Sequence, residues 1–394
     1  MRFLLCFYLL LFPFFSNASA TPTATPKMKV QLQVRHIEAE RWLFEYEFER
    51  PISRIDLGPA RGNFRSSAWS ILGDQVQLKR EGRFEFLDGG GNRFSRLQLE
   101  LRKYNEFPEG SYSPMNLFSD DGVAIYLKNF LGTILLDTQE YDMDLQLTLH
   151  GLDNETTIAP SAHQTSFYLY FGPTQAQSLL GHLAVIDPAT PTWVREVIDT
   201  NYPKLLEVYS KKFTKPIGNM SFLLAVSPNK GESFSLKGGA IENQIAIRFA
   251  GTNIYQDSPR ARSMLQQLLA HELVHIWQQD VVGGGGNPNE RWIHEGGAEL
   301  LASAGLRAAN LWSEEQLQSF IQATLSECAK LAGDLKSYRG GYACGFKRQY
   351  ELGVAPFDLW NALIQSANQS QTMYSEIMLN NVLRDKFGMT TQSH

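Results

Sequence analysis

Two histidines and a glutamate lie within one short segment, His-Glu-Leu-Val-His at 271–275. Apolar residues around it recur at helical spacing, which predicts a helix over 258–281. Positions i and i+4 share one helix face, so His271 and His275 can direct their imidazoles at one ion. Glu272 is next round the helix, where it can take a proton from water. This arrangement is typical of zinc sites that activate water.

A third ligand is needed, because a catalytic zinc keeps three protein ligands and one open position. Glu295 is a candidate near the start of the next predicted helix, 292–309, beyond a glycine run at 283–286. His294 competes with it as a ligand. Glu299, one turn after Glu295 on the same face, can hold the free N–H of a ligand histidine. The alternatives are a solvated helix-start acid for Glu295 and a surface position for Glu299.

The composition is that of a globular protein. The chain has 394 residues, of which 43% are hydrophobic and 20% charged, and this length predicts two or three domains. Its 36 basic and 41 acidic residues give a formal net charge of −5, and no long basic block is present. A nucleic-acid partner therefore has no electrostatic support.

The first twenty residues predict a signal peptide. Arg2 precedes an apolar run over 3–15, and Ala18 and Ala20 form a small-residue cleavage pattern. An uncleaved anchor is the alternative, although the run is short for a transmembrane helix. Cleavage would leave a linker at 21–26. We expect an exported protein, periplasmic or extracellular, with no stable membrane span after cleavage.

Cleavage would also remove one of the three cysteines and leave Cys328 and Cys344. Disulfides form in exported proteins, so these two residues form either a bridge or two buried thiols.

The rest of the chain divides into two regions. Residues 27–184 alternate apolar and polar side chains in short runs separated by turn signals, which predicts a sandwich-like antiparallel sheet domain. Residues 185–390 predict a helix over 193–213, strands over 221–226 and 240–249, and then a helical block. Its helices are expected at 258–281, 292–309, 313–332, 338–352, 356–368 and 372–387. Strands followed by helices indicate an α+β catalytic domain.

Three motifs in the second region resemble those of the gluzincin zinc aminopeptidases, the aminopeptidase N family and the related glycyl aminopeptidase family. Trp-Ile-His-Glu-Gly-Gly-Ala at 292–298 resembles their W-L-N-E-G-x-A motif, with His in place of Asn. Gly-Ala-Ile-Glu-Asn at 239–243 resembles their exopeptidase motif G-x-M-E-N, with Ile in place of Met. Tyr-Arg-Gly-Gly at 338–341 resembles a third motif, a Tyr-x-x-Gly at a helix start.

The resemblance implies a thermolysin-like gluzincin catalytic domain behind a β-rich N-terminal domain. It implies one zinc ion per chain, and it selects Glu295 as the ligand beside His271 and His275. Glu272 is then the general base, and His294 lies beside or at the rim of the site.

The resemblance also implies how a substrate is held. Tyr338 would donate a hydrogen bond to the oxyanion, and Tyr342, one turn further, is the rival for this role. Glu242 would face the α-ammonium group of a peptide. Gly239 and Ala240 would lie on an edge strand that pairs with the peptide backbone.

The sequence as a whole predicts an exported zinc metallopeptidase acting on peptides or proteins, and more specifically an aminopeptidase. One alternative is a zinc endopeptidase of the same mechanism, in which Glu242 is structural. Another is a zinc-free binding protein descended from a peptidase.

Overall fold

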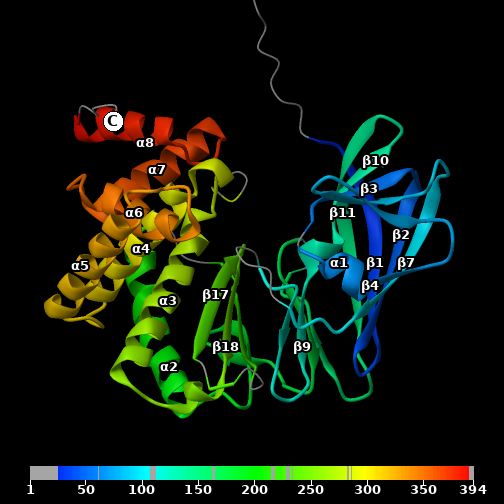
Figure 1. The fold of residues 1–394 in the computed structure, drawn as a ribbon, viewed down its shortest axis with the longest axis horizontal. Helices are drawn as coiled ribbons and strands as arrows, with labels where there is room; N and C mark the ends of the chain where they lie inside the picture. The colour runs from blue at the N-terminus through cyan, green and yellow to red at the C-terminus, as the bar shows by residue number, and fades with distance from the viewer. Residues whose placement is uncertain are drawn as a thin grey trace, which may run out of the picture.

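The computed structural model describes residues 25–389, except 61, 107–111, 162–164, 214–217, 228–230, 233, 282–283 and 285. The expected signal peptide and residues 21–24 of the expected linker lie outside this part. Figure 1 shows a β-rich N-terminal region beside a helical block, with a smaller sheet between them. The α+β fold class predicted from the sequence is confirmed.

The N-terminal region is built mainly of two sheets. A nine-stranded sheet has the order β4-β7-β2-β1-β11-β10-β3-β6-β5, and a four-stranded sheet has the order β12-β13-β9-β8. The strands of the larger sheet are β1 (Lys27–Glu38), β2 (Arg41–Ile52), β3 (Arg54–Pro59), β4 (Trp69–Leu72), β5 (Gln77–Glu81), β6 (Phe84–Asp88), β7 (Phe94–Arg102), β10 (Thr133–Leu136) and β11 (Gln139–His150). Those of the smaller sheet are β8 (Met115–Leu117), β9 (Val123–Tyr126), β12 (Thr156–Ile158) and β13 (Tyr168–Gly172). Two short helices accompany them, α1 (Phe64–Ala68) and η1 (Leu127–Phe130).

Period-two patterning explains these strands. Along β1 the side chains of Met28, Val30, Leu32 and Val34 are fully buried, while those between them are exposed. The sheet is not wholly antiparallel as expected, because β1 pairs with β11 in parallel. Since β1 pairs with β2 on its other side, it joins the two halves of the nine-stranded sheet.

The C-terminal region begins with a five-stranded sheet of order β14-β15-β16-β18-β17. Its strands are β14 (Gln177–Leu179), β15 (His182–Ile186), β16 (Ser221–Ser227), β17 (Ser235–Ile241) and β18 (Gln244–Ala250). The neighbours β15, β16 and β18 are parallel, and their side chains are largely buried. This sheet starts at Gln177, a few residues before the boundary after 184 that we expected.

The single strand predicted over 240–249 is wrong. The segment is the end of β17, a two-residue turn at Glu242 and Asn243, and then β18. Glu242 has a φ of 50°, as the first central position of such a hairpin turn requires. The apolar residues on both sides of the turn suggested one strand, and neither turn residue is a glycine that would have marked the break.

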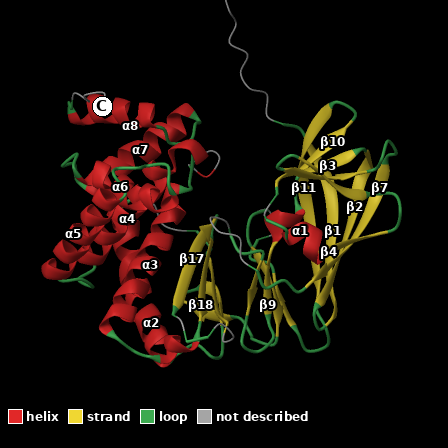
Figure 2. Cartoon of the chain, viewed as in Figure 1, coloured by secondary structure: helices red, strands yellow, loops and turns green. Residues whose placement is uncertain are grey.

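Helices cover one side of this sheet (Figure 2). The helical block as a whole consists of α2 (Thr192–Lys212), α3 (Pro259–Gln278), α4 (Arg291–Ala308), α5 (Glu314–Lys330), α6 (Tyr338–Tyr350), α7 (Pro356–Ser370) and α8 (Glu376–Phe387), with 3-10 turns η2 (Thr252–Tyr255) and η4 (Pro288–Glu290). One core joins side chains of the sheet to those of α2, α3, α4, α7 and α8. No helix in the described ranges is long and apolar enough to cross a membrane.

Helices α4 and α6 approach each other through glycines. A Cβ added to Gly296 would lie 2.2 Å from the carbonyl carbon of Gly345, and one added to Gly345 would lie 2.3 Å from the Trp292 oxygen. The buried side chain of Gln349 on α6 donates to the Ile293 oxygen at 2.9 Å. These contacts fix α6 against the first turns of α4.

The two regions meet in a cluster of buried side chains and at one buried carboxylate. In the cluster, aromatic residues of the N-terminal region pack against strands of the five-stranded sheet. Asp187, which is fully buried, accepts hydrogen bonds from the backbone N–H groups of Ser119 at 2.8 Å, Val226 at 2.9 Å and Ala189 at 2.9 Å. The Ser119 hydroxyl is a further partner. Asp187 therefore ties a turn of the N-terminal region to the sheet of the C-terminal region.

We expect Asp187→Ala to destabilise the protein strongly. Each buried donor left without a partner costs about 1–3 kcal/mol, and this change strips several at once. The exposed Asp199→Ala on α2 is the control, and its free energy of unfolding should change little. Denaturant unfolding of both variants tests this, and equal stability of the two would contradict the role given to Asp187.

Candidate metal centre

The centre begins with α3, whose sequence fixes both its start and its burial. Ser258 caps the helix by accepting from the Ala261 N–H, and Pro259 occupies its first position. The final turns are buried all round, and His271 and His275 are 4% and 5% exposed. Their Nε2 atoms lie 3.0 Å apart and face the same point.

Glu295 completes the cluster from α4. Its Oε2 atom lies 3.4 Å from the Nε2 of His271 and 3.5 Å from the Nε2 of His275. One ligand atom from each of the three residues lies within 4.8 Å of the others. Oε2 is buried and has no hydrogen-bond donor among the described residues. Two imidazoles and an unpartnered carboxylate oxygen are the donor set that zinc prefers, so these residues fit the ion.

Glu295 and His271 favour opposite charges in each other. Burial disfavours the ionised form of Glu295, but the two histidines, whose Nε2 atoms lie 3.4 and 3.5 Å from Oε2, hold the pKa of Glu295 well below its ordinary value. Burial likewise opposes charge on His271, yet its contacts with Glu295 and Glu299 raise its pKa well above the ordinary value. Glu295 therefore carries a negative charge beside the imidazoles.

Side chains behind the histidines fix their orientation. The Nδ1 of His275 lies 2.7 Å from Oε1 of Gln278, which accepts its proton and leaves Nε2 free to bind an ion. Glu299 places its Oε1 atom 3.3 Å from the Nδ1 of His271, the position expected for it from the sequence. Glu299 is itself held by Gln267, at 2.8 Å.

Glu272 lies between α3 and the edge strand β17. It is 6% exposed, and a Cβ added to Gly238 would lie 2.8 Å from its Cγ and Oε1 atoms, so only glycine allows this approach. Its carboxylate accepts a hydrogen bond from the Ala240 N–H. Burial raises the pKa of Glu272 despite the opposing effect of the histidines. A carboxylate with a raised pKa is suited to take and return a proton.

The two tyrosines of α6 are placed differently. Tyr342 packs its ring 5.5 Å from that of His271, whereas Tyr338 lies outside it and is 55% exposed. Burial and the Glu295 carboxylate raise the pKa of Tyr342, which keeps its hydroxyl protonated. Of the two rivals, Tyr342 is therefore the one beside the ligands.

The free edge of β17 is partly occupied within the protein. The Ala240 oxygen accepts from the Tyr112 hydroxyl at 2.7 Å and from Nε2 of Gln279 at 2.9 Å. The Tyr112 ring also covers Gly239, where an added Cβ would lie 2.5 Å from it. We expected Gly239 and Ala240 to contact a substrate directly, but both are engaged by side chains of this chain.

Glu242 and His294 are half-buried. The N–H groups of Ser166 and Thr165 reach the Glu242 carboxylate, and burial raises its pKa. Its Oε2 atom is buried and has no partner within the described ranges. His294 stacks on His275 at 4.5 Å, and burial lowers the pKa of His294 to about 3, so its ring is neutral.

Sequence reasoning missed several of these contacts. Gln278, which contacts His275, and Arg291, which donates to Oε1 of Glu295, had local signals. They lie three residues after His275 and four before Glu295, which are helix-neighbour spacings. Tyr112 had none, because it is 128 residues from its partner Ala240.

A disulfide joins Cys328 on α5 to Cys344 on α6. Cys344 lies two residues after Tyr342, so the bridge restrains the part of α6 that carries this tyrosine.

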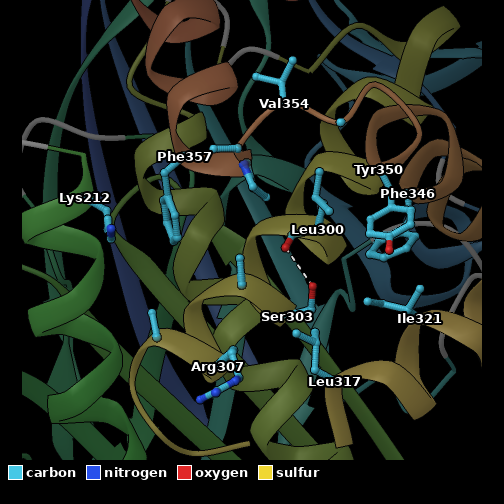
Figure 3. A pocket seen from close by; sticks show the side chains of 15 residues that line it. Lys212, Leu300, Ser303, Arg307, Leu317, Ile321, Phe346, Tyr350, Val354 and Phe357 are labelled. Carbon is cyan, nitrogen blue, oxygen red and sulfur yellow. Dashed lines mark hydrogen bonds between the residues drawn. The ribbon is translucent and has the colours of Figure 1, made fainter. Parts of the chain in front are cut away.

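A separate hollow of about 640 Å³ lies on another face of α4. Figure 3 shows it between Leu300, Ser303 and Arg307 on one side and Phe346 and Tyr350 on the other. None of the three candidate ligands lines it, so it is not the metal centre.

The fold has counterparts among solved structures. An aminopeptidase N family protein from Idiomarina loihiensis superposes with a TM-score of 0.64 at 12% identity, over 91% of this chain and 74% of that one. Yeast LTA4 hydrolase in complex with bestatin superposes with a TM-score of 0.55 at 10% identity, over 94% of this chain and 68% of that one. An M1 zinc metallopeptidase from Deinococcus radiodurans, bound to a Tyr-Ser-Ala substrate, gives 0.50 at 14% identity, over 93% and 91%.

The chain has the fold of these enzymes. The resemblance stated from the sequence motifs is thereby confirmed at the level of structure. No family model matches the chain, and no curated protein matches it in sequence.

Gln278→Met should lower the affinity of the metal-free protein for zinc by about 10–100-fold, the usual effect of losing a partner behind a ligand histidine. The exposed Gln318→Met on α5 is the control. Competition against a chromophoric chelator measures both affinities. Unchanged affinity in the Gln278 variant would show that the bond to His275 does not orient this ligand.

Proposed function

We propose that this protein is an exported zinc-dependent peptidase that removes residues from the N-terminus of peptides. The observation that carries the zinc peptidase assignment is the convergence of His271, His275 and Glu295 beside the buried carboxylate of Glu272. The solved structures named above, which share the fold, include zinc metallopeptidases. Export rests on the signal pattern in the first twenty residues.

Each residue of the centre has a separate chemical role. His271, His275 and Glu295 would hold the ion, which, when bound, would supply the Lewis acidity that makes water a nucleophile near neutral pH. The Glu272 carboxylate takes a proton from the attacking water and delivers it to the leaving amine. The Tyr342 hydroxyl donates to the carbonyl oxygen as charge develops on it.

The edge of β17 supports binding of an extended peptide. Ile241 and Gln244 close the hairpin, so alternate residues before them present backbone groups to the free edge. Ala240 is one of these, and its groups are occupied. Gly238 is the next, and it lies against Glu272. We therefore place the peptide backbone beside Gly238, next to the general base.

Glu242 supports cleavage at the N-terminus. Its unpartnered Oε2 is a buried acceptor at the end of β17, and buried carboxylate oxygens require a donor. A peptide's α-ammonium group supplies both a donor and the opposite charge.

Glu272→Gln should lower kcat by at least a hundredfold and leave zinc in place, because this carboxylate moves a proton and is not a ligand. Glu295→Gln should lose zinc on dialysis. Metal analysis and peptide hydrolysis of both variants test the two roles. Equal zinc loss in the two would mean that they are assigned wrongly.

The aminopeptidase assignment predicts that peptides with a free N-terminus are cleaved and their acetylated forms are not. Glu242→Ala should reduce this discrimination about ten- to a hundredfold, the contribution of a charge-assisted hydrogen bond. The exposed Glu140→Ala is the control. If the wild type cuts acetylated peptides at internal bonds as fast as free ones, the protein is an endopeptidase.

A further inference from the structure

Arg291 is the first residue of α4 and lies one turn before Glu295. Its Nε atom donates to Oε1 of Glu295 at 3.2 Å, and its Nη2 atom lies 3.1 Å from the same oxygen. Nη2 also donates to the Tyr342 hydroxyl at 3.0 Å. One guanidinium thus joins a candidate ligand on α4 to a tyrosine on α6.

The two oxygens of Glu295 have different surroundings because of this contact. Oε1 accepts the hydrogen bond from Nε of Arg291 and lies beside Nη2, whereas Oε2 faces the two histidines and has no donor in the described part of the chain. With Oε1 occupied, the carboxylate presents one oxygen to an ion. Arginine suits this task, because its planar fork fixes the direction of an oxygen as well as its charge.

The contact with Tyr342 has a directional consequence too. A phenol carries one proton, and here its oxygen already accepts a bond from Arg291. The hydroxyl proton must therefore point away from the guanidinium. The Tyr342 ring lies against that of His271, and a hydrogen bond joins the Tyr342 hydroxyl to Tyr338. A substrate carbonyl at the metal ligands would therefore take this proton in place of Tyr338.

The position of Arg291 is itself restrained. Its guanidinium carbon lies 4.5 Å from the ring centre of Tyr338 and 5.3 Å from that of Tyr342. Its side chain is 35% exposed, against 14% for Glu295. Tyr338 thus covers the guanidinium, which gives this tyrosine a role other than meeting the oxyanion.

We propose that Arg291 is a positioning residue that couples the two halves of the site: it reserves Oε2 of Glu295 for the metal and aims the Tyr342 hydroxyl at the reacting carbonyl. The first role requires only metal binding, and the second rests on the proposed peptidase function.

Zinc affinity tests the first role without any turnover. Arg291→Met should bind zinc about 10–100-fold more weakly than the wild type. Arg291→Lys should lie between them, because an ammonium group keeps the charge but lacks the fork. The control is Arg339→Met on α6, whose side chain is 71% exposed and pairs with Glu327. Wild-type affinity in Arg291→Met would overturn the proposal.

A double-mutant cycle at saturating zinc tests the second role. Tyr342→Phe should lower kcat by about a hundredfold with little change in KM. Arg291→Met should also lower kcat, but Arg291→Met combined with Tyr342→Phe should be no slower than Tyr342→Phe alone. Additive losses in the cycle would show that Arg291 does not act through the tyrosine, and so would overturn this role.

Thermal unfolding of each metal-free variant separates these effects from misfolding. If Arg291→Met proves unstable, the zinc affinity and kcat of Arg291→Lys are compared with those of the wild type instead. Wild-type values of both in the lysine variant would overturn the proposal. If the wild type hydrolyses no peptide, the proposed function fails, and the zinc affinities alone decide the role of Arg291.

Discussion

The site depends on one electrostatic constraint, which is that charges buried together must compensate one another. His271, His275, Glu272 and Glu295 all lie in a volume from which water is largely excluded. An unpaired charge in such a place is costly, so each group needs a partner of fixed position. The strand β17 and the helices α3 and α4 supply such partners, among them the Ala240 N–H group, Gln278 and Glu299. A divalent cation at the three ligand atoms completes this balance.

The packing of helices α3, α4 and α6 sets the positions of these charged groups. The two histidines share one helix, so their separation follows from the helical repeat alone. Glu295 is on another helix, and its position depends on how closely α4 packs against its neighbours. The contact of Gly296 with Gly345 brings α6 onto α4 at backbone distance, and the disulfide at Cys344 ties the same helix to α5. Arg291 then spans the gap that remains between α4 and Tyr342.

Local patterns predicted much of this structure. The helices follow from apolar spacing and caps, and the ligand histidines follow from a four-residue interval. The hairpin at Glu242 was missed, because apolar residues lie on both sides of the turn and no glycine marks it. The occupation of the β17 edge could not be predicted, since Tyr112 reaches Ala240 from another region of the fold. The choice between Tyr338 and Tyr342 likewise depends on how α6 lies against α3, which no local pattern specifies.

The parallel pairing of β1 with β11 has a consequence for the order in which the chain folds. β1 is the first described strand, yet its partner Asp142–His150 follows it by more than a hundred residues. During synthesis, β1 and β2 can form a hairpin early, but one edge of β1 stays open until β11 has been made. Pairings of such long sequence separation close slowly, because the intervening chain must first be confined. The two halves of the nine-stranded sheet therefore unite in a late step, after each has formed its own local hairpins.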